Sequence, residues 1–345
     1  MKQILKRPWI WIGLAILGVL FVYPYYQRVF APNVSTPEGK PFEFFISTGS
    51  DYLMVGEKLL ENKLIQDAKA FHWVAKRMNY PRHVYPGRYI IQDGMTTREL
   101  VTLLRSGKQE PMRFTFVKFR TKDQLAEYVG TQLEMSKRDL LALLDDKEYL
   151  SKHNGLTPEI AMTVFIPNTY ELYWDISSKE FFERMFREYK NFWNEARNQQ
   201  RKKLGLNRLE VMTLASIVEE ETNKNDEKPR VAGVYLNRLR KKWPLQADPT
   251  VKYAVGDFSI RRVLNKHLQA DSPYNTYLYP GLPPGPICTP SISSIEAVLN
   301  GERHSYMYFC ARADGSGYHH FSETQAQHNA YAREFHNMLN QKGIR

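Results

Sequence analysis

The sequence predicts an α+β protein with an amino-terminal transmembrane helix, a small α/β module and a larger, mainly helical α+β domain. An uncharged apolar run at residues 9–26 predicts the membrane helix. A strand–helix–helix pattern occurs twice, about 70 residues apart, and predicts small mixed units. Beyond residue 163, apolar residues recur at helical spacing and predict the helical part of the chain.

The composition is that of a folded protein with an acidic partner. The chain has 345 residues, of which 43% are hydrophobic, and this excludes wholesale disorder. Its 2 cysteines exclude a disulfide scaffold. The 48 Lys and Arg residues exceed the 37 Asp and Glu residues, which gives a net charge of +11. Such a charge suits nucleic acid, anionic lipid or an acidic polymer without choosing among them.

The amino-terminal run narrows this choice. As a helix, residues 9–26 would be about 27 Å long, close to the thickness of a bilayer core. Lys2, Lys6 and Arg7 precede the run, so residues 1–8 should stay in the cytoplasm and the body should lie outside it. The alternative is a cleaved signal peptide, but no Ala-x-Ala site follows the run. This topology disfavours a nucleic-acid partner.

Cys288 and Cys310 would then lie in a compartment where disulfides persist. The sequence leaves two options open, a disulfide between them or two buried and inert thiols.

The first module is predicted at residues 42–107, after a polar linker at residues 27–41. Strands are expected at residues 42–46 and 87–91, and helices after Ser50 or Asp51 and at about residues 67–78. Thr96 and Glu99 have the spacing of a capping box and open a further helix.

The pattern recurs at residues 113–160. A strand-like run at residues 113–119 is followed by two helices, which Asp123 and Ser136 are placed to cap. The larger domain of residues 108–345 therefore begins with a strand–helix–helix subdomain.

A helix at residues 209–222 contains three consecutive glutamates. An apolar stripe of this helix is flanked by Glu219 and Glu221, whereas Glu220 is expected to face solvent. A carboxyl group at the edge of a buried face can have a raised pKa and protonate a leaving oxygen at neutral pH. Helical geometry does not separate Glu219 from Glu221, and three surface glutamates are the simpler interpretation.

Several loops combine aromatic rings with hydrogen-bonding side chains. They lie at residues 165–171, 244–250, 272–277 and 281–286. Each one alone is typical of a tight turn. Sugars offer apolar faces and polar rims, so the loops together indicate a glycan-binding groove.

Four motifs of the chain, taken together, resemble the MltG, or YceG-like, family of endolytic murein transglycosylases. They are LASIVEEET at residues 214–222, LQADPTV at residues 245–251, YNTY at residues 274–277 and GLPPGPICTPS at residues 281–291. The resemblance implies that residues 42–107 form a LysM-like module and residues 108–345 a YceG-like catalytic domain. It implies Glu219 as the catalytic acid and base. It also implies substrate-binding roles for Glu221, Gln246, Asp248, Thr250, Asn275 and Tyr277.

The implied activity is cleavage of nascent peptidoglycan strands between N-acetylmuramic acid and N-acetylglucosamine, leaving 1,6-anhydromuramoyl ends and terminating strand elongation. The implied place is the cytoplasmic (inner) membrane, with a single pass, the catalytic domain in the periplasm or extracytoplasmic space, and cell-wall synthases as partners. No cofactor and no metal are expected, since the spacing of His319, His320 and His328 matches no usual ligand motif.

Two rival functions stay open. A muramidase-type hydrolase would use Asp248 or Glu171 as a second carboxylate. A non-catalytic peptidoglycan-binding scaffold would need no carboxylate at all.

Overall fold

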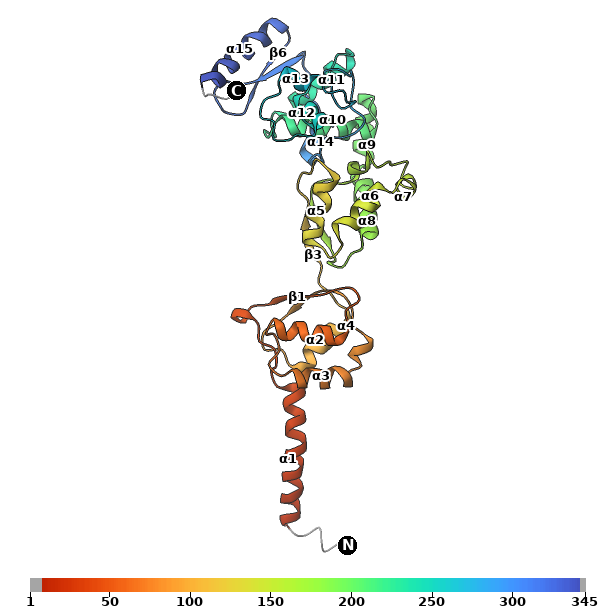
Figure 1. The fold of residues 1–345 in the computed structure, drawn as a ribbon, viewed down its shortest axis with the longest axis vertical. Helices are drawn as coiled ribbons and strands as arrows, with labels where there is room; N and C mark the ends of the chain where they lie inside the picture. The colour runs from red at the N-terminus through yellow and green to blue at the C-terminus, as the bar shows by residue number, and fades with distance from the viewer. Residues whose placement is uncertain (1–7, 342–345) are drawn as a thin grey trace. The chain divides into compact units, whose positions relative to one another are not determined.

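The computed structural model describes residues 8–341, without the side chains of residues 8–11, 13–15, 17, 21 and 341, and divides the chain into two compact units (Figure 1). The first unit comprises Met1–Arg113 and Glu171–Ile176, and the second comprises Phe114–Tyr170 and Ser177–Arg345. Lys2, Lys6 and Arg7, on which the predicted orientation depends, lie outside the described residues.

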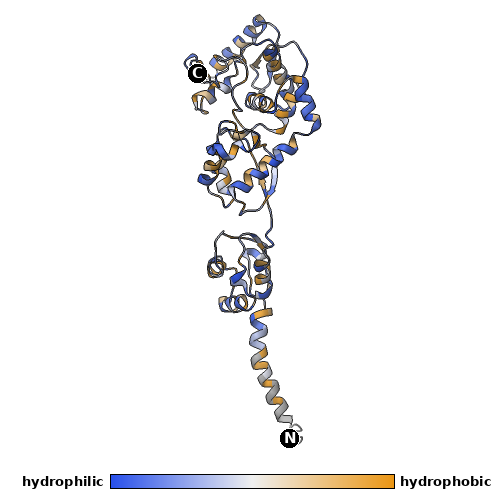
Figure 2. Cartoon of the chain, turned by 90° about the vertical axis from the view of Figure 1, so that its right-hand side faces the viewer, coloured by the Kyte–Doolittle hydropathy of each residue, from blue (hydrophilic) through white to orange (hydrophobic). Residues whose placement is uncertain are grey.

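Helix α1 (Pro8–Phe30) contains the apolar run of residues 9–26 and extends into the predicted linker. Its side chains Ile12, Val19 and Leu20 are exposed, whereas Val29 near its carboxyl end is buried in the core of the first unit; orange segments mark the helix in Figure 2. No helix among the described residues combines the length and the mean hydropathy needed to cross a bilayer. The predicted transmembrane helix is therefore unsupported by the structure.

The first unit contains the two strands that the sequence predicts at residues 42–46 and 87–91. Its strands β1 (Phe42–Ile46) and β2 (Gly87–Ile91) pair antiparallel, with Phe42 opposite Ile91 and Ile46 opposite Gly87. The order along the chain is β1, two helices, β2 and a third helix, as the sequence predicts. The helical elements are α2 (Tyr52–Glu61), α3 (Ala68–Arg77), α4 (Thr97–Ser106) and the short 3₁₀ helices η2 (Pro37–Gly39) and η3 (Tyr80–Arg82).

Side-chain caps fix where these helices begin. Asp51 accepts hydrogen bonds from two backbone N–H groups at the start of α2, and Asp67 accepts one at the start of α3. Thr96 and Glu99 form the predicted capping box. Alternate residues of each strand, Phe44 and Tyr89 among them, are buried against the helices and form the core of the module.

The second unit is mainly helical. Strand β3 (Met112–Thr115) pairs with β4 (Thr169–Leu172), and the division between the units falls within these strands. Thr121, rather than the predicted Asp123, caps α5, whereas Ser136 caps α6 as predicted. The elements before the glutamate helix are α5 (Lys122–Gln132), α6 (Lys137–Asp145), α7 (Lys147–Ser151), η4 (Ala161–Val164), α8 (Ser178–Phe192) and α9 (Glu195–Leu204).

The glutamate helix is α10 (Arg208–Glu221), and other helices surround it. It packs against α11 (Lys228–Arg240), α12 (Asp248–Val255) and α14 (Ile292–Leu299). All residues from Val211 to Val218 are buried, so the helix has no solvated face along this stretch. The remaining elements are α13 (Asn265–Leu268), the antiparallel strands β5 (Tyr308–Ala311) and β6 (His319–Ser322), and α15 (Gln325–Gln341).

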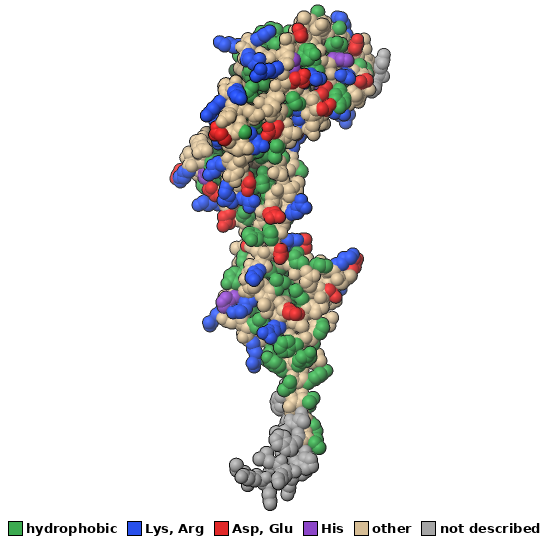
Figure 3. Space-filling view, turned by 180° about the vertical axis from the view of Figure 1, so that it is seen from behind, with side chains coloured by type: hydrophobic (Ala, Val, Ile, Leu, Met, Phe, Trp, Pro, Cys, Tyr) green, Lys and Arg blue, Asp and Glu red, His purple; other side chains and the backbone are tan. Residues whose placement is uncertain are grey.

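The positive charge of the chain does not gather into one patch on the face shown in Figure 3. Lys and Arg side chains are interspersed there with Asp and Glu over both units. A mixed surface of this kind gives no sign of a nucleic-acid track.

Candidate active site

The last turn of α10 directs three consecutive carboxyl groups to different surroundings. The helix begins at a capping box made by Asn207 and Glu210, which fixes its amino-terminal end. It ends with Glu219, Glu220 and Glu221, where the helix dipole disfavours negative charge. Because successive residues turn by about 100° around a helix, each carboxyl group meets its own set of partners.

The carboxylate of Glu219 accepts several hydrogen bonds from neighbouring side chains. Its Oε2 accepts hydrogen bonds from Lys228 Nζ at 3.1 Å, from Ser294 Oγ at 2.6 Å and from the hydroxyl of Ser291. Burial raises the pKa of Glu219, but these hydrogen bonds and the charge of Lys228 outweigh burial, and the net pKa is lowered. The expectation that the apolar helix face raises the pKa of Glu219 is therefore wrong.

Glu220 forms ion pairs rather than facing solvent. Its carboxylate lies 2.9 Å from Lys118 Nζ and 2.7 Å from an Nη of Arg120. Burial raises the pKa of Glu220. The hydrogen bonds from Arg120 and Lys118 and the charges of these two residues together outweigh burial, so the net pKa is lowered. The predicted solvated position is wrong because the subdomain around α5 supplies these two cations.

Glu221 has the environment of a general acid. Its Oε1 accepts a hydrogen bond from the hydroxyl of Tyr235, a buried residue of α11. Burial raises the pKa of Glu221 to about 7, and the nearby charge of Asp248 acts in the same direction. This carboxyl group is therefore about half protonated at neutral pH, as an acid and base catalyst requires.

Glu221 lines a cavity of about 460 Å³, a size typical of ligand sites. The walls come from the ends of α10 and α11, from the loop before α12, and from β5, β6 and α15. The other residues lining it are Tyr235, Arg238, Leu245, Gln246, Asp248, Tyr277, Tyr308, Phe309, Cys310, Ala311, His319, Gln325, His328, Ala332, Phe335 and His336. Glu219 and Glu220 do not line it.

Three of the predicted substrate-binding residues lie with Glu221 around this cavity. They are Gln246, Asp248 and Tyr277. Gln246 has a positive φ of 50°, so its backbone is held in a strained, left-handed conformation beside the cavity. Tyr277 donates its hydroxyl hydrogen to Asp248 Oδ1 at 2.6 Å. Carboxyl, amide and phenol groups thus converge on one cavity, as glycan recognition requires.

Thr250 and Asn275 have structural positions instead. Both are 0% exposed, and neither lines the cavity. Thr250 donates to the carbonyl of Ala247 at 2.6 Å, and the amide of Asn275 donates to the carbonyls of Leu268 and Ala270. They hold the loops that carry Gln246, Asp248 and Tyr277, which explains why they occur within the same motifs.

Some cavity residues are not predicted from the sequence. Tyr235 occurs within an apolar helical stretch, and its spacing in the sequence does not mark it as a residue of the site. Arg238 is buried and donates to the carbonyls of Met307 and Leu245, so it joins α11 to two walls of the cavity. Cys310 lines the cavity, while Cys288 is buried next to α10, and both thiols are free in the structure.

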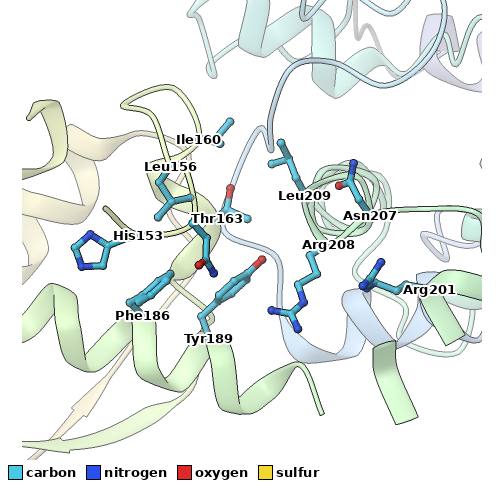
Figure 4. A pocket seen from close by; sticks show the side chains of 11 residues that line it. His153, Leu156, Ile160, Thr163, Phe186, Tyr189, Arg201, Asn207, Arg208 and Leu209 are labelled. Carbon is cyan, nitrogen blue, oxygen red and sulfur yellow. The ribbon is translucent and has the colours of Figure 1, made fainter. Parts of the chain in front are cut away.

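A second cavity in this unit, about 390 Å³ in volume, differs in its chemistry (Figure 4). Phe186 and Tyr189 form part of its wall, and Arg201 and Arg208 supply its charge. No Asp or Glu lines it, so it offers no carboxyl group for acid and base catalysis. The cavity around Glu221 combines carboxyl, amide and phenol groups and is the candidate active site.

The chain is similar to proteins of known family. Residues 44–334 match the model of the YceG-like family. The chain is 30% identical over 311 residues to an endolytic murein transglycosylase of Bacillus subtilis (strain 168), which covers 86% of this chain and 85% of that protein. It is 27% identical to an endolytic murein transglycosylase of Streptococcus pneumoniae serotype 2 (strain D39), which covers 94% of this chain and 64% of that protein. A crystal structure of a YceG-like protein from Listeria monocytogenes has a TM-score of 0.55 and 30% identity, and the match covers 85% of this chain and 99% of that one.

Proposed function

This chain belongs to the YceG-like family, and on that premise we propose that the cavity around Glu221 cleaves murein glycan strands with Glu221 as acid and base. The protein is an endolytic murein transglycosylase, a lyase that acts on peptidoglycan. The observation that supports Glu221 most strongly is its place in the cavity with a pKa of about 7.

One carboxyl group suffices for this reaction. Protonated Glu221 gives its proton to the glycosidic oxygen between N-acetylmuramic acid and N-acetylglucosamine, and the bond from that oxygen to the anomeric carbon breaks. The 6-hydroxyl of the same muramic acid attacks its own anomeric carbon, and the Glu221 carboxylate takes the hydroxyl proton. The attack is intramolecular, so proximity lowers the barrier. The product carries a 1,6-anhydromuramoyl end, and the proton on Glu221 is restored.

Glu221 is preferred to Glu219 for two reasons. The ammonium group of Lys228 and two serine hydroxyl groups stabilise Glu219 as a carboxylate, which is the wrong form for the first proton transfer. Glu219 also lines no part of the cavity. Its proposed role is to fix the last turn of α10, and thereby to place Glu221.

A hydrolase is the second candidate, because Asp248 lines the same cavity as Glu221. With two carboxyl groups at one site, water could attack the anomeric carbon and leave a reducing end. Glu171 offers no such argument, since it does not line this cavity.

Purified uncrosslinked glycan strands test both candidates when the released fragments are identified by mass spectrometry. Anhydro ends support the transglycosylase, and reducing ends support the hydrolase. Glu221→Gln should lower the rate of release by about 10²–10⁴-fold, the usual contribution of general acid–base catalysis. Retention of more than a tenth of the wild-type rate would contradict the role of Glu221 as sole acid and base.

The cellular place is part of the same proposal. Peptidoglycan lies outside the cytoplasm, so the catalytic unit should be there too, with cell-wall synthases beside it. The apolar run at residues 9–26, preceded by Lys2, Lys6 and Arg7, is the support for an anchor in the cytoplasmic membrane with its amino terminus inside. Membrane fractions washed with alkali test the anchor. Release of the full chain into the wash would contradict it.

A further inference from the structure

His319 is a cavity residue that the proposed mechanism does not use. It is the first residue of β6 and lines the cavity with Glu221. Its partner is Glu227, which immediately precedes α11, is only 3% exposed and does not line the cavity. The pair therefore connects a buried carboxylate to a ring at the cavity wall.

Glu227 fixes this ring by two contacts. Its Oε2 lies 2.9 Å from His319 Nδ1, and its Oε1 accepts the backbone N–H of His319 at 2.9 Å. Both oxygens of one buried carboxylate are thus bound to the same residue. A neutral imidazole in this position carries its proton on Nδ1 and leaves Nε2 as a hydrogen-bond acceptor. Phe309, another cavity residue, packs edge-on against the ring at 5.4 Å and limits its rotation.

The other side of the ring is available to a ligand. Glu227 binds the Nδ1 side of the ring and does not line the cavity, whereas His319 does, which points to the Nε2 side as the one that faces the cavity. Within residues 8–341, Nε2 has no hydrogen-bond partner. Orientation of a ring by a buried carboxylate behind it is the arrangement by which histidines are held for metals or substrates. The described residues contain no group of three His, Cys, Asp or Glu suited to a metal.

We propose that His319 contacts the substrate, with its Nε2 accepting a hydrogen bond from a sugar hydroxyl in the cavity, and that Glu227 is the residue that positions it. Glycan strands carry many hydroxyl donors, and the neighbouring side chains Tyr235 and Arg238 already donate to Glu221 and to backbone carbonyls. The inference rests on the proposed function of the cavity. It does not depend on the identity of the catalytic glutamate.

Two substitutions of His319 separate substrate contact from a purely structural role. His319→Asn keeps an amide donor near the position of Nδ1, so the bond to Glu227 can form, but removes the acceptor at Nε2. His319→Gln reaches the position of Nε2 with its amide and gives up the bond to Glu227. We expect His319→Asn to lower kcat/KM about 5–100-fold, the loss of one hydrogen bond with its desolvation. The thermal midpoint should stay near that of the wild type.

The matched control is His320→Asn. His320 is the next residue, its ring stacks on Tyr331 at 4.3 Å, and it does not line the cavity. It should keep kcat/KM within about twofold of the wild type. Equal kcat/KM for His319→Asn and His320→Asn would overturn the proposal, as would a loss that merely follows a lowered thermal midpoint.

Glu227→Gln tests the positioning role because it should move the ring proton of His319 from Nδ1 to Nε2. Its amide N–H₂ would donate to Nδ1, which moves the ring proton to Nε2 and turns this atom into a donor. We expect a loss of kcat/KM similar to that of His319→Asn. Nitrogen NMR of labelled histidine should show Nε2 unprotonated in the wild type and protonated in Glu227→Gln. A protonated Nε2 in the wild type would contradict the assignment.

Measurements of saccharide binding test the role of His319 separately from the proposed catalytic activity. In the background of Glu221→Gln, a defined tetrasaccharide of alternating N-acetylglucosamine and N-acetylmuramic acid should shift the Nε2 resonance of His319. Adding His319→Asn should weaken binding of this tetrasaccharide about 5–100-fold. A tetrasaccharide that binds without moving the Nε2 resonance would overturn the role of His319 alone. Absence of cleavage by the wild type, with binding retained, would overturn the catalytic proposal alone.

Discussion

The hydroxyl of Tyr277 donates to Asp248 Oδ1 at 2.6 Å and joins the first residue of α12 to the loop that follows α13. Both side chains line the cavity that contains Glu221. The contact holds a negative charge near Glu221, and that charge is one cause of the raised pKa of Glu221. Asp248 therefore acts on the carboxyl group of Glu221 through the electric field, and it does so from a fixed position.

The first prediction concerns this charge. Asp248→Asn removes it, so the pKa of Glu221 should fall and less Glu221 should be protonated at neutral pH. The fall of kcat/KM at alkaline pH should begin at a lower pH, with a roughly two- to tenfold loss near pH 8. Tyr277→Phe is the control, because it removes the hydroxyl and leaves the charge. An alkaline limb that stays in place, or moves to higher pH, would argue against an electrostatic role for Asp248.

The second prediction concerns the stability of the glutamate helix. Lys228 is 4% exposed, and Glu219 is the carboxylate bound to its ammonium group. Glu219→Ala leaves this charge buried without its partner, which should lower the free energy of unfolding by about 3–5 kcal/mol. Glu220→Ala is the matched control, because it removes the ion-paired glutamate that follows Glu219 in the same helix.

The partners of Glu220, Lys118 and Arg120, keep about a third of their side-chain surface in water, with values of 32% and 34%. They can be solvated when Glu220 is removed, so the loss should be about 1 kcal/mol. Urea unfolding measures both values. Equal losses would mean that Glu219 is not the structural member of the three.

The sequence was sufficient to predict the elements of the first module, because their signals are local. The caps Asp51 and Thr96 and the alternating strands β1 and β2 depend on residues close together in the chain. The surroundings of α10 are not local. Ser291 and Ser294 reach Glu219 from more than 70 residues away, and Arg120 reaches Glu220 from 100 residues away.

This difference explains why periodicity does not predict the surroundings of Glu219 and Glu220. A single apolar stripe predicts one buried face, but α11, α12 and α14 cover α10 on several sides. The charge state of each carboxyl group is then set by which donor lies opposite it. That information lies in the tertiary contacts, and so does the convergence of Gln246, Asp248 and Tyr277 on Glu221.

The third prediction concerns the free thiols. Cys310 is partly buried and lines the cavity, whereas Cys288 is buried beside α10. N-ethylmaleimide should therefore label Cys310 and leave Cys288 unmodified in the folded protein. Burial raises the pKa of the Cys310 thiol, so labelling should be slow at pH 7 and faster as pH rises.

The label on Cys310 should block the cavity and abolish strand cleavage. Cys310→Ser should keep its activity in the presence of the reagent, and bound glycan should protect the wild type. Mass spectrometry of digested protein identifies the labelled residue. A fully labelled and fully active protein would show that substrate does not occupy the cavity beside β5.

The last prediction links the pKa of Glu221 to stability. In the folded state this pKa is about 7, against 4.5 for the free side chain. Between these values the folded protein holds a proton that the unfolded chain has lost, so stability falls as pH rises from 4.5 to 7 and stays reduced above 7. Glu221→Gln removes this penalty. It should raise the free energy of unfolding by about 1–3 kcal/mol at pH 8 and change it little at pH 4.5.

Glu220→Gln provides a control of opposite sign. The pKa of Glu220 is lowered by its two cations, so its contribution to stability is present at pH 8 and is lost as pH falls. Its replacement should therefore destabilise the protein at pH 8 and almost as much at pH 4.5, since the contribution is lost only below the free value of 4.5. Urea unfolding of both variants and the wild type at the two pH values gives the comparison. If Glu221→Gln is no more stable than the wild type at pH 8, Glu221 does not carry the burial penalty that keeps its proton available for catalysis.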